Sequence, residues 1–178
     1  MRSRVPFLLR LAAMAFTMAL ASSLAAPVQA TGATLRLSGS FQVKETVTAS
    51  HNGDAVGHVF RHRKFRFAPT CKNGACKSVM TRVRQDGTKV TYATHPQADG
   101  TYTGSTTYPG ACFLRNGGTV ANAYHYRESV VVRPAAPSGT SAASFKGTLR
   151  LVFTPTAIGN NHNCTKGSES LKLSGVKQ

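Results

Sequence analysis

The chain has few acidic residues. Among its 178 residues, 22 are Lys or Arg and only 6 are Asp or Glu, which gives a formal charge of +16. Tryptophan is absent, and no long apolar run follows the N-terminal one, so a multi-span helical membrane protein is excluded. The 16 glycines follow no three-residue period and 41% of the residues are apolar, which excludes collagen and intrinsic disorder. A single small, basic globular domain remains.

Motifs for catalysis and for cofactors are missing as well. The sequence contains no G-x-S-x-G, no H-E-x-x-H, no Walker phosphate loop and no redox C-x-x-C. Its six acids are spread from Glu45 to Glu169, and nothing marks two of them as a catalytic pair. We therefore predict no catalytic residues and no cofactor, and a binding protein is expected before an enzyme.

The N-terminus has the pattern of an export signal. Three arginines within the first ten residues precede an apolar stretch at 11–26, and cleavage is expected after Ala30. The stretch is shorter than the roughly 20 residues that a membrane-spanning helix needs. We predict a signal peptide at 1–30 and a secreted, extracellular domain at 31–178 without a transmembrane segment. That domain keeps 19 basic and 6 acidic residues, a formal charge of +13.

All four cysteines follow the expected cleavage point, and an even number in an exported chain predicts two disulfides. Three pairings are possible. The turn signal Asn73-Gly74 lies between Cys71 and Cys76, so a hairpin would bring these two cysteines within bonding range. We predict that Cys71 pairs with Cys76 and Cys112 with Cys164. A zinc site is disfavoured because the C-x2-C spacing is absent.

Alternating polar and apolar residues predict β-strands. Between 33 and 50, seven of the nine odd positions are apolar and every even position is polar, a period of two that a helix does not produce. The pattern returns at 145–154. Further strands, separated by turn signals such as Asp86-Gly87, are expected at 57–67, 76–85, 88–95, 101–108, 119–133 and around 171–174. No helix is predicted, and residues 134–143 are expected to form a mobile loop.

Eight strands with short connections predict an all-β domain, either an up-and-down β-barrel or a two-sheet β-sandwich. The length of the first strand favours the barrel. Tilted strands in small closed barrels run longer than flat ones, and closure removes the exposed edges of the sheet. The expected fold is therefore a single antiparallel barrel with two disulfides.

The densest basic cluster is the strongest candidate site. Four permanent cations fall within six positions: Arg61, Arg63, Lys64 and Arg66. Phe65 and Phe67 are expected to face the core, so that Lys64 and Arg66 point outward together. Neighbouring strands are expected to add Arg82, Arg84 or Lys89. Cations at alternate strand positions, about 7 Å apart, suit an anionic polymer bound through counterion release. The competing interpretation is that the basic surface only keeps the protein soluble.

Two other groups support narrower hypotheses. Glu45 interrupts the inward face of the first strand, where it would orient a ligand in a cavity or pair with an arginine. Three histidines and an aspartate within twelve residues are weak candidates for metal ligands: His51, Asp54, His58 and His62. Their alternate spacing on a strand does not specify tetrahedral geometry, so we predict no metal.

The sequence thus predicts a secreted cationic binding module for an anionic extracellular polymer or surface: a cell-wall polymer, an acidic polysaccharide or a nucleic acid. The alternative is a β-barrel carrier of a small apolar ligand, with Glu45 or a tyrosine as the polar contact and an internal pocket of roughly 300 Å³ or more. A secreted hydrolase or an inhibitor has less support.

Overall fold

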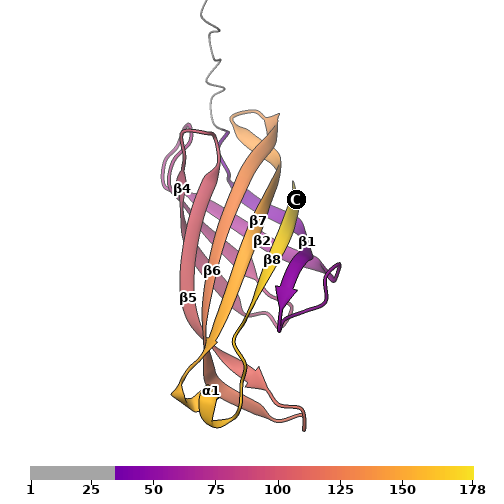
Figure 1. Cartoon of the computed structure of the whole chain (residues 1–178). Coiled ribbons are helices and arrows are strands. Elements are labelled where there is room, and N and C mark those ends of the chain that lie inside the picture. The colour runs from indigo at the N-terminus through magenta and orange to yellow at the C-terminus, as the bar shows by residue number, and fades with distance from the viewer. Residues whose placement is uncertain (1–34) are drawn as a thin grey trace, which may run out of the picture. The chain divides into compact units, whose positions relative to one another are not determined.

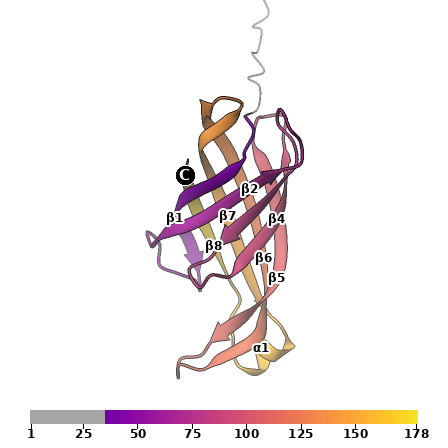
Figure 2. The same ribbon diagram turned by 180° about the vertical axis from the view of Figure 1, so that it is seen from behind.

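The computed structural model describes residues 35–178, so the predicted signal peptide lies outside the described residues. Eight antiparallel strands form a closed barrel in chain order (Figures 1 and 2). The strands are β1 (Gly39–His51), β2 (Val59–Pro69), β3 (Ser78–Val83), β4 (Lys89–Pro96), β5 (Tyr102–Phe113), β6 (Thr119–Ser138), β7 (Ser141–Pro155) and β8 (Gly167–Lys177). The up-and-down barrel is confirmed over the sandwich. Within 35–178, no helix is long and apolar enough to cross a membrane.

Barrel closure depends on the pairing of β1 with β8, which runs from Phe41 opposite Lys177 to His51 opposite Ser168. The predicted alternation holds along β1: Phe41 is buried, whereas Lys44 on the other face is exposed. Since successive side chains of a strand point to opposite faces, the sequence pattern directly separates the interior of the barrel from its outer wall.

Two local expectations are wrong. Residues 134–143 do not form a mobile loop, because β6 continues to Ser138 and β7 begins at Ser141. The ladder extends past the prolines of this segment to the Ser138–Ser141 pair, and Gly139 takes a positive φ of 60° in the tight turn. A helix, α1 (Ala157–Asn161), also forms after β7 and is capped by Thr156. Five residues are too few to show helical periodicity in the sequence.

Aromatic side chains fill one half of the barrel. Phe41 contacts Phe67 and Phe145 with ring centroids 5.5 and 5.3 Å apart, and Phe65 lies 6.0 Å from Phe145. Tyr102 is fully buried beside them. The protein's own side chains therefore fill this part of the interior.

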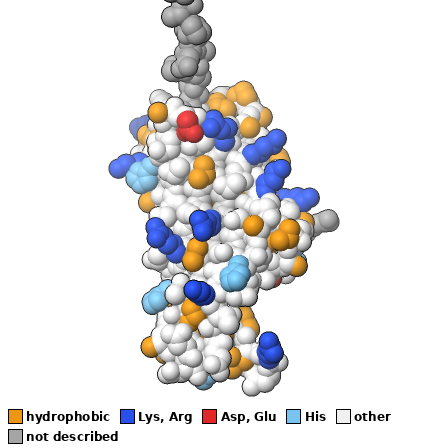
Figure 3. Space-filling view, viewed as in Figure 1, with side chains coloured by type: hydrophobic (Ala, Val, Ile, Leu, Met, Phe, Trp, Pro, Cys, Tyr) orange, Lys and Arg blue, Asp and Glu red, His pale blue; other side chains and the backbone are white. Residues whose placement is uncertain are grey.

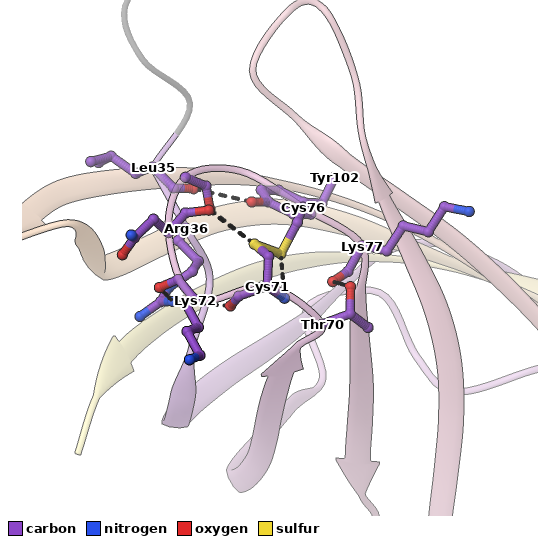
Figure 4. Close-up of a disulfide and its surroundings, with 10 residues drawn as sticks. Leu35, Arg36, Thr70, Cys71, Lys72, Cys76, Lys77 and Tyr102 are labelled. Carbon is purple, nitrogen blue, oxygen red and sulfur yellow. Dashed lines mark hydrogen bonds between the residues drawn. A yellow bond between two sulfur atoms is a disulfide. The ribbon is translucent and has the colours of Figure 1, made fainter.

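The segment before β1 covers this end of the barrel. The N–H of Ala142 donates to the carbonyl of Arg36 at 2.9 Å, and Leu37 is fully buried. The predicted disulfide between Cys71 and Cys76 forms in the loop between β2 and β3. The Arg36 guanidinium donates to the carbonyls of Cys71, at 3.2 Å, and of Lys72 (Figure 4). The disulfide loop is therefore hydrogen-bonded to the segment that leads into β1.

The second predicted disulfide, Cys112–Cys164, is also confirmed. It joins the end of β5 to the segment between α1 and β8, in the extension that projects beyond the barrel with α1 (Figure 1). Ala123, Tyr124 and Phe153 pack with the two cysteines into a second, smaller core. The bridge thus stabilises a part of the molecule that the main core does not reach.

Candidate functional site

The structure divides the predicted basic cluster between the two faces of β2. Lys64 and Arg66 are exposed on the outer wall, whereas Arg63 is only 7% exposed and lies inside the barrel with Phe65. The same alternation that turns the phenylalanines inward turns Arg63 with them. Arg61 also lies on β2, but its side chain is outside what the structure describes.

Arg82 was expected to join the outer cations and instead lies inside, where it centres a buried ionic cluster. Its guanidinium donates to both carboxylate oxygens of Glu45, at 2.8 and 2.7 Å, and to Oε1 of Glu128 at 3.2 Å. The hydroxyls of Tyr92 and Tyr108 also donate to Glu128. Nε of Arg63 lies 3.7 Å from Glu45. Two carboxylates and two guanidinium groups thus share the interior.

In this cluster, burial and neighbouring charges shift the pKa values of the ionisable groups in opposite directions. Burial raises the pKa of Glu128, and the positive charge of Arg82 acts against this increase. Burial alone would lower the pKa of Arg82, but the hydrogen bonds and charge of Glu45 and the charge of Glu128 hold it above the ordinary arginine value. Burial lowers the pKa of Arg63 in spite of Glu45. In each case the neighbouring opposite charge acts against the effect of burial on the pKa.

Of the roles expected for Glu45, the structure shows the pairing with an arginine. The side chain is fully buried and faces inward, as the alternation implied, and Arg82 binds both of its oxygens. Both oxygens of Glu128 accept hydrogen bonds as well. These carboxylates have the environment of structural ion pairs, because their oxygens are occupied by the protein's own donors.

The described members of the histidine group do not converge on a metal site. Over residues 35–178, no three His, Cys, Asp or Glu side chains come together in a way that could hold a metal ion. The ring of His58 packs against Phe60 with centroids 4.4 Å apart, and His51 contacts the side chain of Asn52. Asp54 donates its backbone N–H to Glu169. The side chain of His62 is outside the described part.

The outer wall of the barrel carries charge of one sign. All three glutamates are buried, and the exposed acids of the described chain are three aspartates in bends and turns: Asp54, Asp86 and Asp99. Exposed basic residues occur on the strands: Lys44, Lys64, Arg66, Lys89, Arg127, Arg133, Lys146, Arg150 and Lys172. Figure 3 shows Lys and Arg side chains along most of one face, with very few acidic side chains between them.

Three of these cations surround a groove of about 470 Å³ where β7, β8 and β1 lie side by side. We call the site formed by Lys44, Lys146 and Lys172 the lysine groove. Ser174 of β8 pairs with Lys44 on one side and with Lys146 on the other, so the two lysines flank it. Lys172 follows two residues away on the same face. None of the three lysines forms an ion pair with an acid of the described chain.

The chain matches no family model, and no curated protein matches it either. The lysine groove therefore has to be interpreted from its chemistry. Three unpaired ammonium groups around a concave surface suit a ligand that carries several negative charges.

Sequence reasoning missed this groove because its residues come from distant strands. Lys44 and Lys172 become neighbours only through the pairing of β1 with β8, and Lys146 joins them through β7. The available signal was that each lysine occupies an outward position of an alternating strand. Register between strands, which a single sequence does not contain, was needed to place them together.

Proposed function

We propose that the protein is a secreted cationic binding module that holds an anionic extracellular polymer in the lysine groove. The observation that carries this proposal is the convergence of Lys44, Lys146 and Lys172 on a wall whose strands present no exposed acid. The two disulfides support the exported location, since such bonds persist in oxidising compartments.

The spacing of the cations suits a polymer. Lys44 and Lys146 lie on strands separated by β8, which places their backbones about 10 Å apart at the usual distance between strands. Lys64, opposite Gln42 of β1, continues the basic surface onto β2. A chain of carboxylate or phosphate groups laid across these strands would relieve the repulsion between the cations and release its own counterions.

Neutralising the lysine groove tests the proposal. The variant K44Q/K146Q/K172Q is expected to bind immobilised alginate, an acidic polysaccharide, roughly tenfold or more weakly at low salt. Fewer released counterions should also flatten the dependence of affinity on salt. Retention of residues 31–178 on alginate, with neutral dextran as the reference matrix, measures both effects.

A matched variant separates the site from net charge. Lys72, Lys77 and Lys166 are exposed lysines outside the groove, so K72Q/K77Q/K166Q removes the same charge from other positions. This control is expected to retain most of the alginate affinity. If both triple variants lose equal affinity, or if neither does, the lysine groove is not the binding site.

A further inference from the structure

The ladder between β4 and β5 is incomplete. It runs only from Ala93 opposite Ser105 to Pro96 opposite Tyr102, although β4 begins at Lys89 and β5 continues to Phe113. The first part of β4 therefore diverges from β5, and a cleft of about 440 Å³ lies between them. This volume is within the range of small-molecule sites in proteins, about 300–1,000 Å³.

Two cations stand at this cleft without a bound counter-charge. Arg84 and Lys89 both line it, and neither forms an ion pair with an acid of residues 35–178. The nearest acid in sequence, Asp86, accepts hydrogen bonds from the N–H and the hydroxyl of Thr88 through one oxygen. The guanidinium carbon of Arg84 lies 5.8 Å from the ring centroid of Tyr108 and 6.0 Å from that of Tyr126. The guanidinium of Arg84 thus lies near two aromatic rings, while its charge acts on Asp86 and Glu128 only from beyond ion-pair distance.

One side of the cleft is apolar and fixed in place, and Thr88, Thr91 and Thr106 supply the rest of the lining beside the two cations. Tyr108 stacks on Tyr126 with centroids 5.3 Å apart, and its hydroxyl is anchored on the buried Glu128. Burial raises the pKa of Tyr108 against the opposing charge of Arg84, so the hydroxyl keeps its proton for that bond. Val90 and Pro109 complete the apolar lining. Rigid aromatic walls lower the entropy cost of binding because they need no ordering.

We propose that the β4–β5 cleft binds a small organic anion with a flat apolar body, whose acidic group contacts Arg84 and Lys89 and whose rings lie against Tyr108, Val90 and Pro109. The oxygens of Glu128 accept hydrogen bonds from Arg82, Tyr92 and Tyr108, so this carboxylate is engaged inside the barrel and forms no ion pair with Arg84. This site is distinct from the lysine groove, and its ligand is a small molecule rather than a polymer.

A matched pair of dyes tests the proposal. Anilinonaphthalene sulfonate has two apolar ring systems and one anionic group, whereas phenylnaphthylamine has the same rings without the charge. Fluorescence titration of the folded, oxidised protein is expected to show one site for the anionic dye and at least tenfold weaker binding of the neutral one. The variant R84Q is expected to bind the anionic dye about tenfold or more weakly, the usual size for a lost charged hydrogen bond.

A second variant keeps the test valid if R84Q is unstable. Thr91 is exposed and lines the cleft, so T91W fills the space and leaves both cations in place. It is also expected to lose the anionic dye, with circular dichroism showing an intact barrel. Equal binding of the two dyes, or unchanged binding by R84Q and T91W, overturns the proposal. Loss of the dye in K44Q/K146Q/K172Q, with binding intact in R84Q, would overturn it by placing the anion in the lysine groove.

Discussion

Replacing Arg82 by methionine is expected to lower the free energy of unfolding by about 3–5 kcal/mol, the usual cost of breaking a buried ion pair from one side. Arg82 binds Glu45 through two hydrogen bonds and Glu128 through a third, and all three side chains are buried. Methionine fills a similar volume but takes away the cation that donates hydrogen bonds to both carboxylates. Arg63 beside Glu45 and the more distant charge of Arg84 near Glu128 remain. Urea unfolding of the oxidised protein at pH 7 measures the change.

The loss of stability in R82M is expected to shrink as the pH falls. Burial already raises the pKa of Glu128 while Arg82 opposes the increase, so removing Arg82 raises this pKa further. A carboxyl with a higher pKa in the folded state binds more protons there, and folding then gains stability as the pH falls through the folded pKa toward the unfolded value of roughly 4.3. Unfolding curves between pH 7 and pH 4.5 test the sign.

An exposed arginine provides the matched control. Arg133 pairs with Asp99 at 3.2 Å on the surface, where solvent screens the interaction. R133M removes the same charged group as R82M and is expected to change the stability little at any of these pH values. If R82M is no more destabilised than R133M, the interior ion pairs do not have the structural role that their geometry indicates.

Removal of the long-range disulfide Cys112–Cys164 is also expected to lower the free energy of unfolding by a large amount. In the loop-entropy treatment, C112A/C164A is expected to lose about 4 kcal/mol, because the bridge closes a loop between residues 52 positions apart. The bond also joins the extension around α1 to β5, where Tyr124 and Phe153 form only a small core. Chemical denaturation of this variant and of the oxidised parent, side by side, gives the difference.

The short disulfide is the internal control. Cys71 and Cys76 are separated by 5 positions, so C71A/C76A is expected to lose about 2 kcal/mol by the same treatment. The ratio between the two variants tests the entropic explanation. A larger loss in C71A/C76A would show instead that the contacts of Arg36 with the carbonyls of Cys71 and Lys72 dominate at that end of the barrel.

Much of the fold could be predicted because strand alternation is local. The period of two at 33–50 anticipated β1, and turn signals such as Asp86-Gly87 separated β3 from β4. The favoured cysteine pairing needed only one hairpin and the assumption of an oxidising compartment. The hairpin at 134–143 was missed because Pro, Ala and Ser are typical of loops, whereas here pairing with β7 continues the ladder across them.

The sites could be predicted less well because they depend on register and on which face each residue occupies. The run around Lys64 looked like one basic cluster, yet Arg63 lies inside the barrel and only Lys64 and Arg66 reach the outer wall. Glu45 was correctly placed on the inward face, but its partner Arg82 was expected outside. A linear sequence does not show that residues 37 positions apart will meet across the barrel.

Pairing between β1 and β8 also determines when the barrel can close during synthesis. Phe41 meets Lys177 only when the last strand is available, so the barrel cannot close while the C-terminal part of the chain is still being made. Contacts between such distant residues slow folding, because the ends of a long loop must first find each other. Until β8 has been synthesised, β1 therefore keeps an unpaired edge, which is where an unfinished β-barrel is most open to pairing with another chain.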